Sequence, residues 1–122
     1  MDKIKVLMVD DEAQFRETTS KILTRRGYQT TVAGSGEEAL DTLKKESHDV
    51  VVLDIKMPIH DGIYLMKALG NIEKRIPVIV ISGYSTEDAM KEAYTMGASR
   101  FLPKPFTPDE LLEAVCQVVG RR

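Results

Sequence analysis

Carboxylate side chains stand at the ends of two apolar segments, and these acids are the residues best suited to chemistry. Asp10 and Asp11 follow the largely apolar residues 4–9. Asp54 follows the continuous run Val50–Leu53. Carboxylates held within about 4 to 6 Å repel one another by several kcal/mol, so a fold that gathers three of them requires a compensating cation. Magnesium, or manganese in its place, suits such a site because it takes hard oxygen ligands and commonly binds carboxylates together with phosphate oxygens.

Two further side chains indicate phosphoryl chemistry at the same place. Ser82 follows the apolar run 78–81 and offers a hydroxyl. Lys104 follows the short apolar segment 101–102 and offers an ammonium. Phosphoryl transfer requires mainly alignment and neutralisation of the equatorial oxygens, which a divalent cation and a lysine can provide. The pattern predicts a phosphate-handling site if the ends of these segments meet in the fold.

The spacing of the apolar residues predicts strands that alternate with helices along the whole chain. Strands are expected at about residues 3–9, 28–32, 50–54, 78–81 and 101–102. Helices are expected at about residues 12–26, after a capping box at 35–38, from 62 to the break at 70–71, from the cap at 85–86 to 97, and from the cap at 107 to 118. Because parallel strands need right-handed crossovers, this alternation predicts a parallel sheet with helices on both faces.

The polarity of each strand predicts its place in the sheet. The first, third and fourth strands in the chain are the most apolar and are expected at the centre, with the second and fifth at the edges. This arrangement is the α/β class, doubly wound, flavodoxin-like (βα)5 fold with strand order 2-1-3-4-5. Its topological switch point lies between the first and third strands, so Asp10, Asp11 and Asp54 are expected to meet at one crevice.

The composition is that of one small domain, expected to cover residues 1–122. The lone cysteine, Cys116, cannot form a disulfide within the chain, which fits the reducing cytoplasm, and we expect it to pack among its valine neighbours. With 17 basic and 19 acidic residues, the chain carries no bulk attraction for nucleic acid or anionic lipid. A signal peptide and a membrane-spanning run are both missing from the sequence. We therefore expect a cytoplasmic domain that contacts neither nucleic acid nor membrane directly.

Short motifs at the ends of successive expected strands resemble the receiver domain of two-component response regulators. They are Asp10-Asp11, Asp54 followed by Met57-Pro58 and Asp61-Gly62, Ser82-Gly83, and Lys104-Pro105. The resemblance covers essentially the whole chain. It implies a phosphoacceptor signalling domain of a phosphorelay, which catalyses its own phosphorylation and slow dephosphorylation and is not a turnover enzyme.

The resemblance also implies a role for each acid. Asp54 would take a phosphoryl group from a phosphohistidine on a sensor histidine kinase or phosphotransfer protein. Asp11 would bind Mg²⁺ directly and Asp10 mostly through water. The backbone carbonyl of Lys56 would complete the protein ligands.

The remaining motif residues would form the switch. Ser82 would hydrogen-bond the phosphoryl group, Lys104 would pair with its oxygens, and the Lys104–Pro105 peptide would be cis. Phe101 would rotate inward on phosphorylation, although it lacks the hydroxyl of the tyrosine that is frequent at this position in relatives.

Two surfaces would contact partners. The fourth helix, fifth strand and fifth helix would form the output surface toward a downstream effector domain or protein, or toward a second copy in a homodimer, and would expose Glu87, Lys91, Tyr94 and Arg100. The kinase would dock on the first helix near Gln14, Phe15 and Thr18, although Phe15 also belongs to the apolar stripe of that helix. The chain is expected to be a stand-alone regulator or a receiver cut from a larger protein.

Other interpretations of the same residues remain open at this point. Taken singly, the acids at 10–12 could complement a helix dipole, and Lys104 could be a solvated lysine. His60 is expected to be an exposed loop histidine and not a catalytic one. A flavin-binding module would share the fold but needs a hydroxyl-rich phosphate loop where this chain has acids. A phosphatase of the haloacid-dehalogenase type would also use an aspartate nucleophile and magnesium, but it usually carries a cap insertion.

Overall fold

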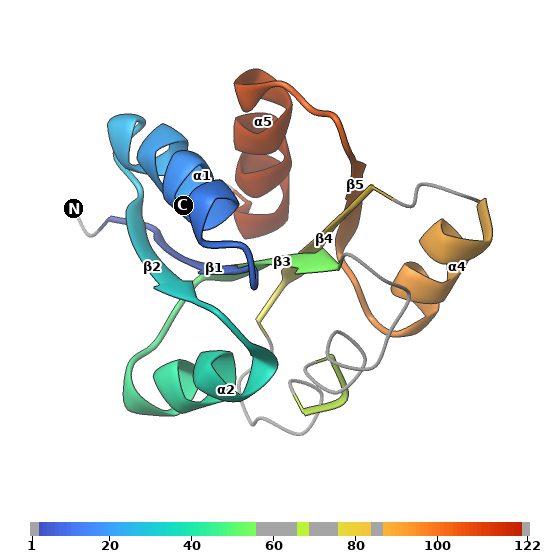
Figure 1. The fold of residues 1–122 in the computed structure, drawn as a ribbon, viewed down its shortest axis with the longest axis horizontal. Coiled ribbons are helices and arrows are strands. Elements are labelled where there is room, and N and C mark those ends of the chain that lie inside the picture. Colours follow the sequence, from blue (N-terminus) through green and yellow to red (C-terminus); the bar gives the residue numbers. More distant parts are fainter. Residues whose placement is uncertain (1–2, 56–65, 69–75, 84–86, 121–122) are drawn as a thin grey trace.

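A computed structural model describes residues 3–55, 66–68, 76–83 and 87–120. Within them, five parallel strands form one sheet in the order β2-β1-β3-β4-β5, as the sequence predicted (Figure 1). Their bounds are β1 Lys5–Val9, β2 Gln29–Ala33, β3 Val50–Ile55, β4 Val78–Ser82 and β5 Arg100–Pro103. The two edge strands are the more polar β2 and the short β5, because only strands buried on both faces need continuous apolar sequence.

Helices cover both faces of this sheet. Figure 1 shows α1 and α5 on one side and α2 and α4 on the other. Their bounds are α1 Ala13–Arg25, α2 Gly36–Lys45, α4 Glu87–Thr95 and α5 Pro108–Val119. Residues 66–68 are helical as well, within the third helix expected from the sequence, whose expected start at 62 and end at 70–71 lie outside the described residues. The Lys104–Pro105 peptide is cis, as expected.

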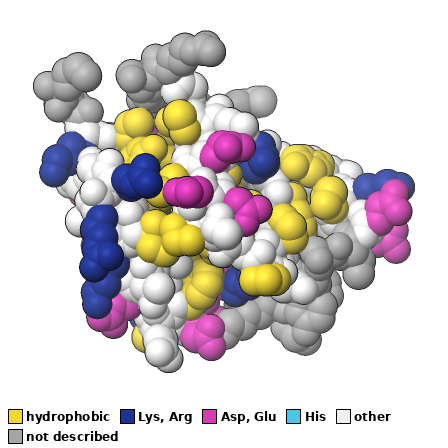
Figure 2. All heavy atoms as spheres, turned by 90° about the horizontal axis from the view of Figure 1, so that it is seen from above, with side chains coloured by type: hydrophobic (Ala, Val, Ile, Leu, Met, Phe, Trp, Pro, Cys, Tyr) yellow, Lys and Arg dark blue, Asp and Glu magenta, His cyan; other side chains and the backbone are white. Residues whose placement is uncertain are grey.

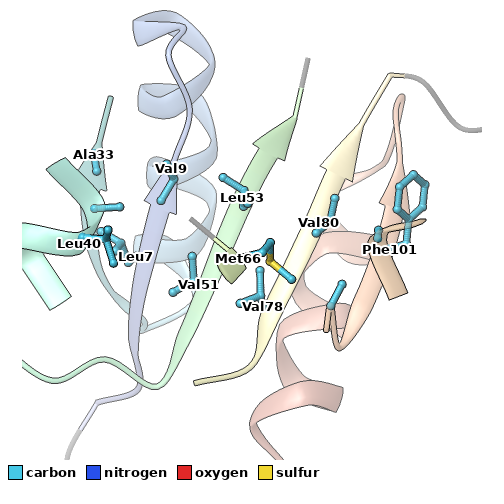
Figure 3. Packing of buried hydrophobic residues seen from close by; sticks show 13 residues of the cluster. Leu7, Val9, Ala33, Leu40, Val51, Leu53, Met66, Val78, Val80 and Phe101 are labelled. Atoms are coloured by element: carbon cyan, nitrogen blue, oxygen red, sulfur yellow. The ribbon is translucent and has the colours of Figure 1, made fainter. Parts of the chain in front are cut away.

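Each face of the sheet has its own apolar core. Alternate strand residues point to opposite faces, so Leu7 and Val9 pack toward α2 while Val6 and Met8 pack toward α1 and α5. Figure 3 shows the first core, in which Met66 and side chains of β1, β3 and β4 lie together, with Phe101 of β5 at one end.

The strand register sets two acids side by side. Val9 of β1 pairs with Leu53 of β3. Asp10 directly follows Val9 and Asp54 directly follows Leu53, so the two acids lie side by side at the carboxyl edge of the sheet. This alignment follows from the parallel ladder alone, because both strands run in the same direction.

The register of the other strands adds a hydroxyl and an amine to the same edge. Ser82 ends β4 and pairs with Ile55 of β3 and Pro103 of β5. Lys104 follows Pro103, and its backbone N–H donates to the carbonyl of Ser82 at 2.9 Å. The carboxyl edge of the sheet therefore carries residues from four strands.

Three apolar side chains lie elsewhere than the sequence predicted. The helical stripe of α4 predicts that Met90 packs in the core, but Met90 is 36% exposed, and Cys116, which was expected to pack among valines, is exposed as well. Met90 and Cys116 each lie one position along the helix from a residue that faces the sheet. One position turns the side chain by roughly 100° around the helix axis, which moves it away from the sheet. The alternation of polar and apolar residues at 28–32 predicts that Val32 lies on a half-buried face, but Val32 is 41% exposed, because β2 is an edge strand.

Side-chain caps define where two helices begin. Ser35 accepts from the N–H of Glu38, as expected, but the Glu38 carboxylate accepts from the N–H of Gly34 at 3.2 Å, one residue before the position a capping box would use. Before α5 the capping box is complete: Thr107 accepts from the N–H of Glu110 at 3.1 Å, and the Glu110 carboxylate accepts from the N–H of Thr107 at 2.8 Å. This cap fixes the start of α5 at Pro108, four residues after Lys104.

We predict that Thr107→Ala lowers the free energy of unfolding by about 1 kcal/mol, because the substitution leaves the N–H of Glu110 without its capping acceptor. Urea unfolding followed by circular dichroism measures the change. Thr107→Ser is the matched control, since its hydroxyl can still cap. An alanine variant as stable as wild type, or a serine variant as unstable as the alanine variant, would contradict this account.

Candidate functional site

An ion pair connects two of the predicted site residues. The Lys104 ammonium lies 2.6 Å from Asp54 Oδ2. The Asp54 side chain is fully buried, whereas the Lys104 side chain retains 24% of its exposure. The lysine therefore reaches from the rim to neutralise a charge that would be costly to bury alone.

Asp10 lies beside this pair and is itself 1% exposed. Burial raises the pKa of the Asp10 carboxyl from 3.8 to about 7, and the neighbouring Asp54 carboxyl raises it further. The N–H of Glu12, which donates to Asp10 Oδ1 at 2.8 Å, and the charge of Lys104 lower it.

The two acids present buried oxygens that fit a cation. Asp10 Oδ2 and Asp54 Oδ1 are inaccessible and accept no hydrogen bond from the described residues. Hard carboxylate oxygens in this condition are suitable Mg²⁺ ligands. One lysine faces two acids, so a further positive charge would lower the repulsion between them.

Asp11 does not join these acids in a compact group. It is exposed, and within the described residues no three Asp, Glu, His or Cys side chains are arranged to hold a metal ion together. The sequence predicted that all three acids meet at one crevice, and the structure brings together two. Because like charges repel, an exposed position is favoured for the third carboxylate, that of Asp11.

The switch residues occupy the neighbouring strands. Ser82 is 4% exposed at the end of β4. Phe101 is 6% exposed and belongs to the core that Figure 3 shows. Its own side chain has no hydroxyl, but its backbone N–H donates to the Tyr94 hydroxyl at 3.1 Å, which ties α4 to β5. On the expected output surface, Glu87, Lys91 and Tyr94 are exposed, whereas Arg100 is half-buried and hydrogen-bonded to Gln117.

Several predicted positions lie outside the described residues. These are Lys56 with its carbonyl, the motifs Met57-Pro58 and Asp61-Gly62, His60, and the helix cap at 85–86.

Arg16 is a site residue that sequence reasoning missed. Its guanidinium donates to the backbone carbonyl of Asp10 at 2.7 Å, while the backbone N–H of Asp10 donates to Ala33 at 3.0 Å. Gly34 leaves room for this arginine, since a Cβ there would lie 2.8 Å from the guanidinium. The main chain of Asp10 is therefore held on both sides. The only indication of this role in the sequence was the position of Arg16, one turn into α1 and six residues after Asp10.

A groove of about 490 Å³ opens next to the ion pair. It lies between α1 and the segment after β5 and is lined by Phe15, Thr18, Thr19, Ile22, Lys104, Pro105 and Phe106. Figure 2 looks onto the side of the molecule that carries α1 and α5, where hydrophobic side chains are mixed with acidic and basic ones. Phe15 and Thr18, two of the three residues expected at a docking face, line this groove.

We predict that Asp10→Asn stabilises the metal-free protein at pH 8 and that the gain shrinks toward pH 4. The folded-state pKa of Asp10 is raised to about 7 from 3.8, so the folded protein holds a proton that the unfolded chain has released, and stability falls as pH rises between these values. Urea unfolding with a chelator at several pH values measures the effect.

Asp41→Asn is the control for this prediction, because Asp41 is an exposed acid on α2, on the other face of the sheet. It should change stability little at any pH. If the Asp10→Asn variant were less stable than wild type at pH 8, the prediction would be contradicted. The charge of the buried Asp10 carboxylate would then already be compensated in the folded protein.

Comparisons with known proteins identify the family to which the chain belongs. The model of the response regulator receiver domain family matches residues 6–116. Sporulation initiation phosphotransferase F of Bacillus subtilis is 39% identical over 111 residues, which are 91% of this chain and 90% of that protein. The DNA-binding transcriptional regulator NtrC of Klebsiella pneumoniae is 38% identical over 93% of this chain, but the match spans only 24% of that longer protein.

A solved structure extends the likeness to three dimensions. Chemotaxis protein CheY4 of Vibrio cholerae superposes with a TM-score of 0.86 at 32% identity, covering 96% of this chain and 99% of that one. In the part of the chain that the structure describes, no helix is long and apolar enough to cross a bilayer. Receiver domains are phosphorelay signalling domains and not turnover enzymes, and their partners are histidine kinases or phosphotransfer proteins and effector domains. The chain belongs to the response regulator receiver domain family.

Proposed function

We propose that Asp54 is the phosphoacceptor of this domain and that its donor is a phosphohistidine on a sensor histidine kinase or phosphotransfer protein. The observation that carries the proposal is the buried Asp54 carboxylate with the Lys104 ammonium 2.6 Å away, beside a second buried acid. A nucleophile needs to be held in place near groups that neutralise the incoming charge, and this arrangement supplies both.

The transfer requires little covalent machinery from the protein. An Asp54 oxygen attacks phosphorus, the O–P bond forms as the P–N bond of phosphohistidine breaks, and the imidazole nitrogen keeps the electron pair and takes a proton. Lys104 then pairs with the phosphoryl oxygens, and Ser82, buried at the end of the adjacent strand, donates its hydroxyl to one of them. Charge-assisted hydrogen bonds of this kind are stronger than neutral ones.

Asp10, Asp11, Asp54 and the backbone carbonyl of Lys56 would hold Mg²⁺, or Mn²⁺ in its place. When bound, the ion supplies positive charge to the phosphoryl oxygens in the transition state. The two buried oxygens without donors, on Asp10 and Asp54, support this assignment. Arg16 would keep Asp10 in position through its main chain.

Phosphorylation would reach the output surface through Ser82 and Phe101. A phosphate of nearly two negative charges would pull the Ser82 hydroxyl inward and change the space available to the Phe101 ring. Movement of β5 at Phe101 would act on α4 directly through the Tyr94 hydroxyl. The α4–β5–α5 surface would then contact an effector or a second copy of the chain.

The phosphohistidine partner would dock in the groove beside α1. This groove ends at Lys104, so a partner seated in it would be next to Asp54. Its largely apolar walls suit the apolar face of a helical partner.

Asp54→Ala should abolish the acid-labile label that acetyl phosphate and Mg²⁺ place on the wild-type protein, because no carboxylate remains to attack. Phosphoprotein gel electrophoresis and intact-protein mass spectrometry measure the label. Asp41→Ala, which removes an exposed acid from α2, is the control and should keep full labelling. A label that survives in the Asp54→Ala protein would place the phosphoacceptor elsewhere.

Thr18→Arg should slow phosphoryl transfer from the histidine kinase that phosphorylates this chain by about tenfold or more, because a long charged side chain would obstruct the groove. Labelling by acetyl phosphate, which needs no docking, should be spared. Thr42→Arg is a matched control on α2: both threonine hydroxyls donate to the carbonyl four residues earlier at 3.0 Å, but Thr42 lies on the other face of the sheet. Equal transfer rates in the two variants would argue against docking at α1.

A further inference from the structure

We propose that the aromatic ring of Phe15 is a positioning residue for the Lys104 ammonium. The inference rests on the proposed role of Lys104 in phosphoryl transfer. Phe15 lies on α1 and is not one of the acidic, hydroxyl or lysine residues of the sequence motifs.

The geometry is that of a cation over an aromatic face. The Lys104 Nζ lies 4.1 Å from the centroid of the Phe15 ring. Attraction between an ammonium and a ring face operates within about 6 Å of the centroid and grows when the pair is shielded from water. The Lys104 side chain is 24% exposed and Phe15 is half-buried, so the contact is only partly solvated.

The ammonium thus has two partners that fix it from different elements. One is the Asp54 carboxylate of β3, at 2.6 Å, and the other is the ring of α1. A lysine side chain has four rotatable bonds and loses considerable conformational entropy when it is held by a single contact. When Asp54 becomes phosphorylated, the carboxylate contact changes, whereas the ring contact can keep the ammonium over the site.

The ring itself is held by a second aromatic residue. Phe106 packs against Phe15 edge to face, with the centroids 6.1 Å apart and the planes at 88°. Phe15, Phe106 and Lys104 all line the groove beside α1. A partner that enters the groove therefore touches the ring that holds the lysine, which connects docking to the placement of a catalytic group.

The contact itself can be tested without phosphorylation. In ¹H–¹³C NMR spectra of the unphosphorylated protein, the ε-CH₂ protons of Lys104 should be shifted upfield by the ring current of Phe15. Phe15→Tyr should keep this shift because it retains the aromatic face, and Phe15→Leu should lose it while keeping an apolar side chain. Lys104 resonances at random-coil positions in wild type would overturn the proposal.

The consequence for function is tested by a double-mutant cycle on acetyl phosphate labelling. Phe15→Leu should slow labelling by about two- to thirtyfold, and Phe15→Tyr should label at close to the wild-type rate. In the Lys104→Met background, Phe15→Leu should have no further effect. Equal slowing in both backgrounds, or no slowing at all, would overturn the positioning role. If the wild-type protein were not labelled at Asp54 at all, the proposed function would be rejected. The NMR result would still report on the contact between Phe15 and Lys104.

Discussion

Two carboxylates buried next to each other, with one ammonium to offset them, are the constraint on which the rest of this structure depends. Asp10 and Asp54 repel, and their burial raises the pKa of Asp10 to about 7. Lys104 is the cation that permits the arrangement, at 2.6 Å from Asp54. The site is therefore poised to gain from any further positive charge, which is a useful property where a doubly charged phosphoryl group has to be accommodated.

The sheet supports this unfavourable cluster by geometry. In a parallel sheet all strands end at the same edge, and the apolar cores on both faces hold the strands in register. Two hydrogen bonds hold the main chain of Asp10 in place. Its carbonyl accepts from the Arg16 guanidinium, and its N–H donates to the carbonyl of Ala33. Packing in the core thus offsets the cost of holding the charged groups of Asp10, Asp54 and Lys104 close together at the edge of the sheet. Such a cost is common at functional sites.

Helix α1 connects the charged site with the surface. One of its turns carries Phe15, over the Lys104 ammonium, and Arg16, on the carbonyl of Asp10. The same helix forms one wall of the groove in which a phosphohistidine partner would bind. On the far side of the sheet edge, the hydrogen bond from Phe101 to the Tyr94 hydroxyl joins β5 to α4. Through Lys104 the site borders the groove beside α1, and the Phe101–Tyr94 hydrogen bond is the contact through which we propose that β5 acts on α4.

The sequence by itself determined the five strands, their order and the capping residues of α2 and α5, because apolar periodicity and capping residues act over short distances in the chain. It also placed Asp10, Asp54, Ser82 and Lys104 at the same edge of the sheet, since each directly follows or ends an expected strand. Only the tertiary structure decided which acids are buried together, leaving Asp11 exposed, and which helical side chains reach the site. Phe15 contacts Lys104, which is far away in the sequence, and Arg16 contacts the main chain of Asp10, six residues earlier. Both contacts depend on how α1 packs across the sheet, which no local pattern encodes. For the same reason the exposed positions of Met90 and Cys116 were missed: the packing angle of a helix decides which flank of its apolar stripe is covered.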